Sequence, residues 1–317
     1  MEILGLSALA LITIILVLAF EVVNGFHDSA NSIATIVATR VLPPAAAVGM
    51  AAVCNFAGVL IGTNIAATIG KGIIDQNLLW ADYGVLLIFC AVMGAIVWDL
   101  ITWWFGIPTS SSHALIGGLI GAGGAVMFVD AIVWSGTSKA VIFMIVSPLA
   151  GLLVAFLVTT LVMRGLKRLS RTTVNKYFRK LQIVSSASYS VGHGANDAQK
   201  GMGIIAMLLL MEQFDSPTSD FVVPLWVKIA CCTCIALGTF FGGWRIVRTM
   251  ASKITHLDPY QGFCAETGAA SLLFTTAHFG IPVSTTHTIS GAIMGVGATK
   301  SLSAVRWGVG KKIVTAW

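Results

Sequence analysis

Charged residues are scarce in this sequence. Asp, Glu, Lys and Arg together make up 10% of the 317 residues, whereas 56% are hydrophobic. Soluble globular domains carry about 25% charged residues, so this composition excludes a water-soluble enzyme and a nucleic-acid-binding protein. At about 20 apolar residues per helical span, the chain is long enough for about eight to ten membrane crossings. We therefore expect an all-α integral membrane protein.

The sequence also lacks the residue patterns of a cofactor, metal or catalytic site. It has six cysteines, all in apolar stretches where a small soft side chain packs well. Cys231 and Cys234 form a CxxC pair, but there is no second pair and no nearby histidine. Walker A and HExxH motifs and a nucleophile–base pair are absent as well. We expect no enzymatic activity, no cofactor, and no metal ion other than a transported one.

Acidic residues are missing from one strongly basic segment. Between residues 164 and 180 the basic side chains are Arg164, Lys167, Arg168, Arg171, Lys176, Arg179 and Lys180. Basic loops between spans stay on the cytoplasmic side, which predicts a cytoplasmic loop over residues 164–182. The span after it then leads outward to an acidic loop with Glu212, Asp215 and Asp220. Binding of nucleic acid or lipid by the basic segment is the alternative.

What the chain does contain is an internal duplication. Residues 105–113 (FGIPTSSSH) recur as residues 279–287 (FGIPVSTTH) at a constant offset of 174. Upstream of each copy lies an acidic motif, at residues 25–31 (GFHDSAN) and 194–200 (GANDAQK). Repeats with matched interruptions, joined by one basic loop, are typical of secondary transporters whose site lies at the repeat interface. Periodicity leaves open whether the halves are inverted.

The duplication predicts the domain organisation. We expect a first transmembrane repeat over residues 1–163 and a second over 183–317, joined by the basic loop. The first half continues after its hairpin motif through a full apolar span, whereas the second half stops at Trp317. The second repeat is therefore expected to lack its last helix.

The hairpin motifs are suited to binding an anion. Pro108 and Pro282 end a preceding helix, and the Ser/Thr run after each is suited to capping a new one. A helix start inside the membrane presents free N–H groups and the positive end of a dipole. Two such starts facing each other would suit a tetrahedral oxyanion such as phosphate or sulfate. The alternative is an ordinary hydroxyl-rich helix interface.

The acidic motifs are candidate cation or proton sites, since ionisable groups at membrane depth usually mark an ion path. Asp28 lies three residues before Asn31, and Asp197 three before Lys200, so each pair shares a helix face. Neighbouring glycines are expected to unwind the helix there. An ion pair of Asp197 with Lys200 and a helix cap at Asp28 are the alternatives. Glu266, another acid in an apolar span, is a candidate protonation site or a cap near the interface.

These motifs resemble a known family. Residues 24–31 (NGFHDSAN) and 192–203 (GHGANDAQKGMG) look like the two signature segments of the inorganic phosphate transporter (PiT) family, and the Gly-Ile-Pro-x-Ser-x-x-His segments match its paired hairpins. The resemblance implies two inverted repeats with broken helices, paired re-entrant helical hairpins and a homodimer. It implies phosphate contacts by Ser110, Ser111, Ser112, Ser284, Thr285 and Thr286. It assigns the cation or proton to Asp28, Asn31, Asn196, Asp197 and Glu266, with His27, Gln199 and Lys200 as further candidates.

The first signature departs from many family members, which carry Asn-Asp in both halves, whereas this chain has His27-Asp28. The His-Asp form resembles bacterial low-affinity members, which move phosphate with protons, often as a neutral metal–phosphate complex. We expect symport of phosphate with protons into a bacterial cell across its cytoplasmic (inner) membrane, with sodium as the alternative coupling ion. A transporter of sulfate or another oxyanion, or an ion channel with a hydroxyl-lined pore, is the alternative function.

Overall fold

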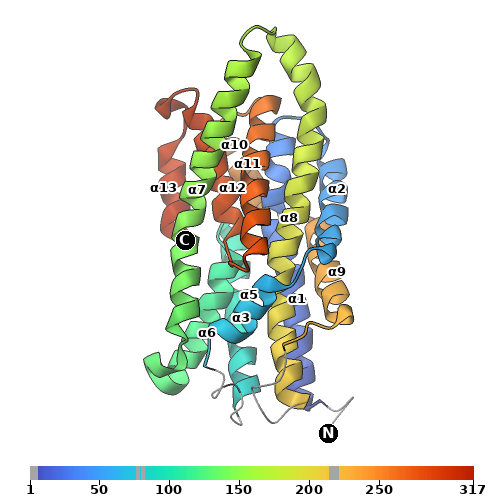
Figure 1. Ribbon diagram of the computed structural model, residues 1–317, viewed down its shortest axis with the longest axis vertical. Helices are drawn as coiled ribbons and strands as arrows, with labels where there is room; N and C mark the ends of the chain where they lie inside the picture. Colours follow the sequence, from blue (N-terminus) through green and yellow to red (C-terminus); the bar gives the residue numbers. More distant parts are fainter. Residues whose placement is uncertain (1–5, 76–78, 80–82, 214–220) are drawn as a thin grey trace.

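The computed structural model describes residues 6–75, 79, 83–213 and 221–317, and these residues form a bundle of helices (Figure 1). Three long helices extend along most of the bundle: α1 (Ala8–Ala38), α7 (Trp134–Leu166) and α8 (Arg171–Gln213). The chain enters α1 at the end of the molecule where the N-terminus lies, whereas α8 begins at the opposite end. The expected all-α architecture is confirmed. Of the acidic loop expected after α8, Asp215 and Asp220 lie outside the described residues.

Among the described residues, three helices are long and apolar enough to cross a membrane: Ala8–Ala38, Gly84–Phe105 and Trp134–Leu166. The number rises to five if each of two bent helix pairs is one span. This is fewer than the eight to ten crossings expected from composition. The difference arises because several apolar runs form short helices, and because buried polar side chains lower the hydropathy of α8 and of α11 (Pro259–His278).

Broken helices are present at positions other than the glycines beside the two aspartates. One bent pair joins α2 (Pro44–Ala57) and the turn η1 (Gly58–Leu60) to α3 (Asn64–Gly72) at 77°. The other joins α9 (Leu225–Phe241) to α10 (Trp244–Lys253) at 71°. Gly242, with φ of 70°, lies at the second break. Left-handed backbone of this kind favours glycine.

The glycines beside the two aspartates do not unwind their helices, so that prediction was wrong. Both α1 and α8 are continuous through the acidic motifs. A Cβ on Gly25 would collide with the carbonyl oxygen of Ile235 in α9, and one on Gly194 with the backbone of Asn55 in α2. These glycines therefore serve close helix crossings, in which backbone meets backbone.

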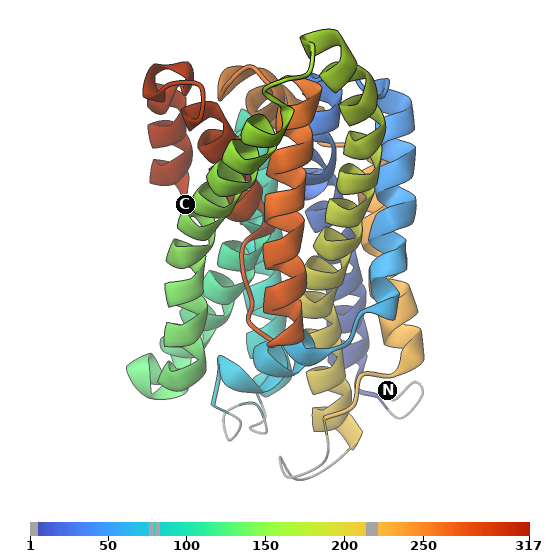
Figure 2. The ribbon, with the colours of Figure 1, turned by 45° about the horizontal axis from the view of Figure 1, so that its top comes forward.

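Two helical hairpins carry the repeated motifs. In the first, α5 (Gly84–Phe105) leads to α6 (Ser111–Met127), and in the second α11 leads to α12 (Thr285–Ala298). Gly106 and Gly280 both have φ of 64°, so the same left-handed residue ends the first helix of each hairpin. From the turn region, α6 and α12 run toward opposite ends of the molecule (Figures 1 and 2).

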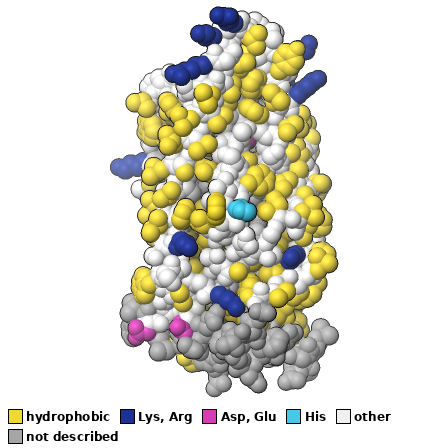
Figure 3. All heavy atoms as spheres, viewed as in Figure 1, with side chains coloured by type: hydrophobic (Ala, Val, Ile, Leu, Met, Phe, Trp, Pro, Cys, Tyr) yellow, Lys and Arg dark blue, Asp and Glu magenta, His cyan; other side chains and the backbone are white. Residues whose placement is uncertain are grey.

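The basic segment is helical over most of its length. It comprises the end of α7, the start of α8 and the short turn that joins them at one end of the bundle (Figure 1). In the space-filling view, Lys and Arg side chains gather at this end, whereas hydrophobic side chains cover much of the face below it (Figure 3). The chain ends with α13 (Trp307–Ala316), which matches the start of α7 in the repeat.

A polar layer divides the interior. One apolar cluster contains Val17 and Phe20 of α1 with residues of α8 from Ala198 onward. The other contains Ile33 and Ile36 of α1 with Tyr189 of α8. Between the clusters, α1 and α8 present buried polar side chains to each other. Both hairpin turns reach this layer, because Ser111 and Thr285 contact its aspartates.

Candidate functional site

Each hairpin tip is a capped helix start. Ser110 Oγ accepts a hydrogen bond from the His113 N–H at 3.3 Å, and Ser284 Oγ accepts one from the His287 N–H at 3.1 Å. These serines are therefore N-caps at equivalent positions of the repeat. A single cap leaves further N–H groups of the first turn without an intrahelical partner. Both tips thus point the positive end of a helix dipole into the polar layer.

The two tips touch. Ser112 Oγ donates a hydrogen bond to the carbonyl oxygen of Val283 across 3.2 Å. The rings of His113 and His287, in the first turns of α6 and α12, lie with their centroids 4.4 Å apart. All six hydroxyl residues expected to contact phosphate are at most 3% exposed. The structure therefore brings together two segments that are 174 residues apart in sequence.

The first-half carboxylate lies against the first tip. Asp28 Oδ1 is 2.7 Å from His27 Nδ1, and Asp28 Oδ2 accepts a hydrogen bond from Ser111 Oγ at 3.2 Å. Asp28 lies within α1 and is 2% exposed, so the helix-cap alternative is wrong. On the other side of the ring, His27 Nε2 is 3.0 Å from Thr102 Oγ1 of α5.

The second-half carboxylate has a richer set of partners. Asp197 Oδ1 pairs with Lys200 Nζ at 2.6 Å, while Oδ2 accepts a hydrogen bond from Thr285 Oγ1 at 3.1 Å. His193 Nε2 is also 3.1 Å from Asp197 Oδ2. Lys200 reaches across to Ser111 Oγ at 3.5 Å. The ion pair considered as the alternative for Asp197 is thus present, and it lies directly beside the hairpin tips.

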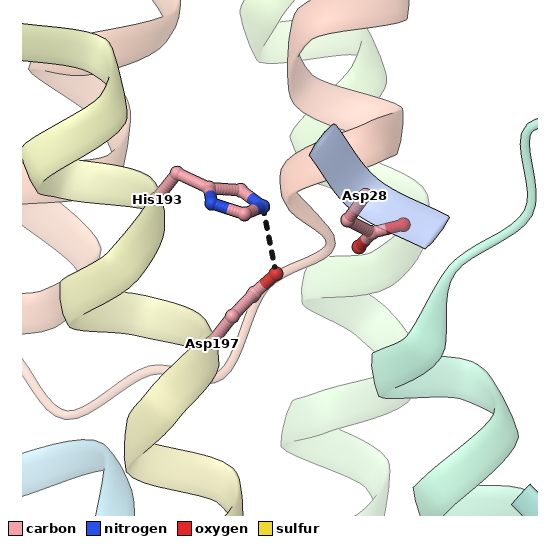
Figure 4. Close-up of side chains that lie close together, drawn as sticks. All are labelled: Asp28, His193 and Asp197. Atoms are coloured by element: carbon pink, nitrogen blue, oxygen red, sulfur yellow. Dashed lines mark ion pairs between the residues drawn. The ribbon is translucent and has the colours of Figure 1, made fainter. Parts of the chain in front are cut away.

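One contributor to the site was not expected from the sequence. Candidate ligand atoms of Asp28, His193 and Asp197 all lie within 4.8 Å of one another, and all three residues are buried. In Figure 4, the Asp28 carboxylate on α1 faces the His193–Asp197 pair on α8. His193 has no counterpart in the repeat, since Asn24 aligns with it, so the duplication did not draw attention to it. Its position one turn before Asp197 was the available signal.

Three predicted residues lie apart from the tips. Asn196 Nδ2 donates to the carbonyl oxygens of Gly192 and Leu273, at 2.8 and 3.1 Å. Gln199 Oε1 accepts from the first N–H groups of α3, those of Ile65 and Ala66. Glu266 belongs to a separate polar cluster, in which it accepts hydrogen bonds from Thr35, Gln182 and Ser185.

Asn31 does reach a tip. Its Nδ2 donates to Thr286 Oγ1 at 2.9 Å and to Thr285 Oγ1 at 3.4 Å. Glu266 is fully buried with three donors, so the alternative of a cap near the interface is wrong. The polar layer therefore holds two clusters: one at the tips, between Asp28 and Asp197, and one around Glu266.

Comparison with known proteins shows the family to which this chain belongs. The profile of the Phosphate transporter family matches residues 24–173 and 165–317. The chain is 54% identical to the probable low-affinity inorganic phosphate transporter of Rhizobium meliloti, over 99% of this chain and 90% of that one. It is 41% identical to the protein of the same description in Bacillus subtilis, over 98% and 92%.

A solved structure described as the sodium-dependent phosphate transporter has the same fold. It matches with a TM-score of 0.89 at 25% identity, over 98% of this chain and 94% of that one. The resemblance found in the signature segments and hairpin motifs is thus confirmed over the full length. The chain belongs to the phosphate transporter family, whose members are multi-pass membrane transporters and not enzymes.

Proposed function

We propose that this protein imports inorganic phosphate by secondary active transport, with the anion held between the two hairpin tips. The observation that carries the proposal is that each tip contacts one aspartate: Ser111 of α6 contacts Asp28, and Thr285 of α12 contacts Asp197. The starts of α6 and α12 and their hydroxyl groups therefore meet in the buried polar layer between the two aspartates. Such donors replace the hydration that an oxyanion loses on entering the membrane.

The proposed phosphate contacts are the hydroxyls of Ser110, Ser111, Ser112, Ser284, Thr285 and Thr286, together with N–H groups of the first turns. In the structure several of these hydroxyls already have partners: Ser112 donates to the backbone carbonyl oxygen of Val283, and Thr285 donates to the carboxylate of Asp197. A phosphate that enters must therefore compete for donors already in use. Binding would part the tips, which links occupancy of the site to movement of the hairpins.

The contacts of His27 support a proposal of proton coupling. The Thr102 hydroxyl donates its single hydrogen to the backbone, since its Oγ1 is 3.1 Å from the Trp98 carbonyl oxygen. It can then accept from the Thr109 hydroxyl and from His27 Nε2, while His27 Nδ1 can donate to the Asp28 carboxylate. With a hydrogen on both ring nitrogens, His27 would be an imidazolium paired with Asp28, and this is the protonated form that we propose. We assign the coupled proton to this pair, with sodium at the aspartates as the alternative.

A divalent cation carried with phosphate would fit a neighbouring position. His193 Nδ1 is 3.1 Å from Asn55 Oδ1, and Asn55 Nδ2 donates to Thr239, which orients the amide oxygen toward the ring. With Nδ1 as donor to Asn55, Nε2 could bind a cation beside Asp197 Oδ2, from which it lies 3.1 Å away. Together with oxygens of Asp28 and Asp197, it offers ligands for a metal–phosphate substrate.

Alternating access would use the duplication. We propose that residues 1–163 and 183–317 are inverted repeats, on the basis that α1 and α8, and likewise α6 and α12, run in opposite directions (Figure 1). Rocking of one bundle against the other then exposes the tips to either side of the membrane in turn. We also propose that the protein lies in the cytoplasmic (inner) membrane, that residues 164–182 face the cytoplasm, and that the protein assembles as a homodimer. Asn196 and Glu266, which lie away from the tips, would support coupling by joining helices that move together.

The proposal is tested by uptake of labelled phosphate into proteoliposomes that contain the purified protein, with proton, sodium and magnesium gradients imposed separately. We expect accumulation against the phosphate gradient under an inward proton gradient. A channel would allow equilibration only, and a sulfate transporter would lose phosphate uptake to excess sulfate. Either result would overturn the proposal. Dependence on sodium alone would overturn the assignment of the coupling ion.

A further inference from the structure

Lys200 is a cation in the middle of the molecule. Its side chain is 1% exposed, and it lies among the largest fully buried side chains of the described residues. The charges of Glu21, Asp99 and Asp197 all interact with its ammonium group. A lysine at this depth is costly unless it is paired. Its place on α8, among carboxylates and beside a hairpin tip, therefore calls for a specific role.

The ammonium group lies where a coupling cation would be held. Lys200 Nζ is 2.6 Å from Asp197 Oδ1 and 3.5 Å from Ser111 Oγ, so it joins the second-half carboxylate to the first-half tip. Carboxylate and hydroxyl oxygens are also the ligands that a monovalent cation such as sodium prefers. At this separation a second positive charge that is not accompanied by an anion, such as a lone sodium ion, would meet strong repulsion in a buried environment.

The two halves of the repeat differ at this position. Lys200 lies three residues after Asp197, and the residue three after Asp28 is Asn31, a neutral amide that contacts Thr286. Asp28 therefore has no resident ammonium on its own helix, and the side chain paired with it is the imidazole of His27. One aspartate of the pair is neutralised permanently by the chain, whereas the other depends on an exchangeable charge.

We propose that Lys200 is a tethered counter-cation: its ammonium replaces the ion that would otherwise bind at Asp197 and excludes sodium from the second half of the site. Each transport cycle then needs one fewer coupling cation, and the exchangeable charge resides at Asp28. The inference rests on the proposed function, because it assumes that both aspartates serve the transported anion. It makes Lys200 a determinant of coupling-ion specificity.

The test compares binding of radioactive sodium and uptake of phosphate for three purified variants. Lys200→Met shortens the side chain by one atom and removes its charge, which leaves Asp197 without its ammonium partner in the interior. We expect this variant to bind sodium, which the unaltered protein does not bind at Asp197. Its phosphate uptake should fall about tenfold or more without sodium and recover when sodium is added, because an uncompensated buried charge is strongly unfavourable.

Two further variants serve as controls. Lys200→Met combined with Asp197→Asn removes both charges, so it should fold and should bind no sodium at this position. Lys180→Met removes an exposed lysine on the same helix and should behave as the unaltered protein does. If Lys200→Met folds poorly, its thermal stability is measured with and without sodium and compared with that of the double variant. Sodium should stabilise Lys200→Met and should not stabilise the double variant.

The proposal is overturned if Lys200→Met neither binds nor is stabilised by sodium, or if it takes up phosphate at the normal rate without sodium. Uptake that is lost and not restored by sodium would also overturn it, because Lys200 would then act as a direct phosphate ligand. Failure of the proposed function is a separate result: the unaltered protein would not accumulate phosphate, while sodium binding to Lys200→Met would remain measurable.

Discussion

Asn31 of α1 donates from Nδ2 to Thr286 Oγ1 of α12 across 2.9 Å, so a side chain of the first half holds the hairpin tip of the second. The reverse contact comes from Lys200 of α8, which reaches Ser111 at the tip of the first hairpin. Each tip is thus held by both halves, and a movement of one half relative to the other changes the contacts of both tips.

Replacement of Asn31 by Ala should weaken phosphate binding. The amide orients the hydroxyls of Thr285 and Thr286, and loss of one such hydrogen bond costs about 1 kcal/mol, or roughly fivefold in affinity. Equilibrium binding of labelled phosphate to purified protein measures the effect. Thr233→Val is the control, since that exposed hydroxyl bonds only to its own helix. Unchanged affinity of Asn31→Ala would argue against a role of the second tip in binding.

Asp197→Asn should abolish uptake while the protein remains in the membrane. The substitution leaves the buried ammonium of Lys200 without its carboxylate and alters the bond from Thr285. Breaking a buried pair by removal of one partner costs about 3–5 kcal/mol, which is enough to block a transport cycle without unfolding a large helical protein. Uptake into proteoliposomes, normalised to the amount of inserted protein, gives the result. Full activity would contradict the proposed site.

His27→Asn should uncouple uptake from the proton gradient. Asparagine cannot take up a proton between Thr102 and Asp28, whereas the imidazole ring of His27, which contacts both, can. We expect phosphate binding to persist and the stimulation by an inward proton gradient to disappear. His278→Asn is a matched control, because His278 lies at the end of α11, outside the tip cluster. Stimulation that survives in His27→Asn would place the coupled proton elsewhere.

Glu266→Gln should separate binding from transport. The carboxylate accepts hydrogen bonds from Thr35, Gln182 and Ser185, and an amide would turn one acceptor into a donor that faces other donors. Because Glu266 contacts neither tip, phosphate affinity at equilibrium should stay within about threefold, while gradient-driven uptake falls about tenfold. Parallel binding and uptake measurements test this. An equal loss of both would place Glu266 in the phosphate site itself.

Two equivalent glycines should respond to alanine with opposite signs. A Cβ on Gly291 of α12 would collide with the Pro148 carbonyl oxygen of α7, whereas Gly117 of α6, at the matching position, faces open space. Gly291→Ala should therefore destabilise the protein by about 1–3 kcal/mol through overpacking. Gly117→Ala should stabilise it by about 0.5–1 kcal/mol, because alanine favours the helix. Thermal unfolding in detergent distinguishes the two, and equal shifts in Tm would contradict the packing.

Much of this site could be predicted from local sequence. Pro108 and Pro282, followed by hydroxyl residues, predict capped helix starts, and duplication implies that two similar tips are used together. Asp28 and Asp197 are acids in apolar surroundings, so the sequence also identifies them as candidate site residues. These features depend on neighbours within a few residues, which the sequence displays directly.

Other features depend on what packs against a residue, which the sequence does not display. Gly25 and Gly194 are compatible with unwinding or with close packing, and only the approach of α9 and α2 decides between them. The sequence shows that Glu266 is an acid in an apolar span. It does not show that Glu266 lies away from the hairpin tips, because that distance depends on how α11 packs in the bundle. His193 became recognisable only once Asp28 was found opposite it.

The most direct test of the central claim is a structure determined with phosphate bound. The account predicts density for the anion between the first turns of α6 and α12, in contact with hydroxyls from both tips, such as Ser111 and Thr285. Phosphate in contact with one tip alone, or bound outside the layer between Asp28 and Asp197, would contradict it.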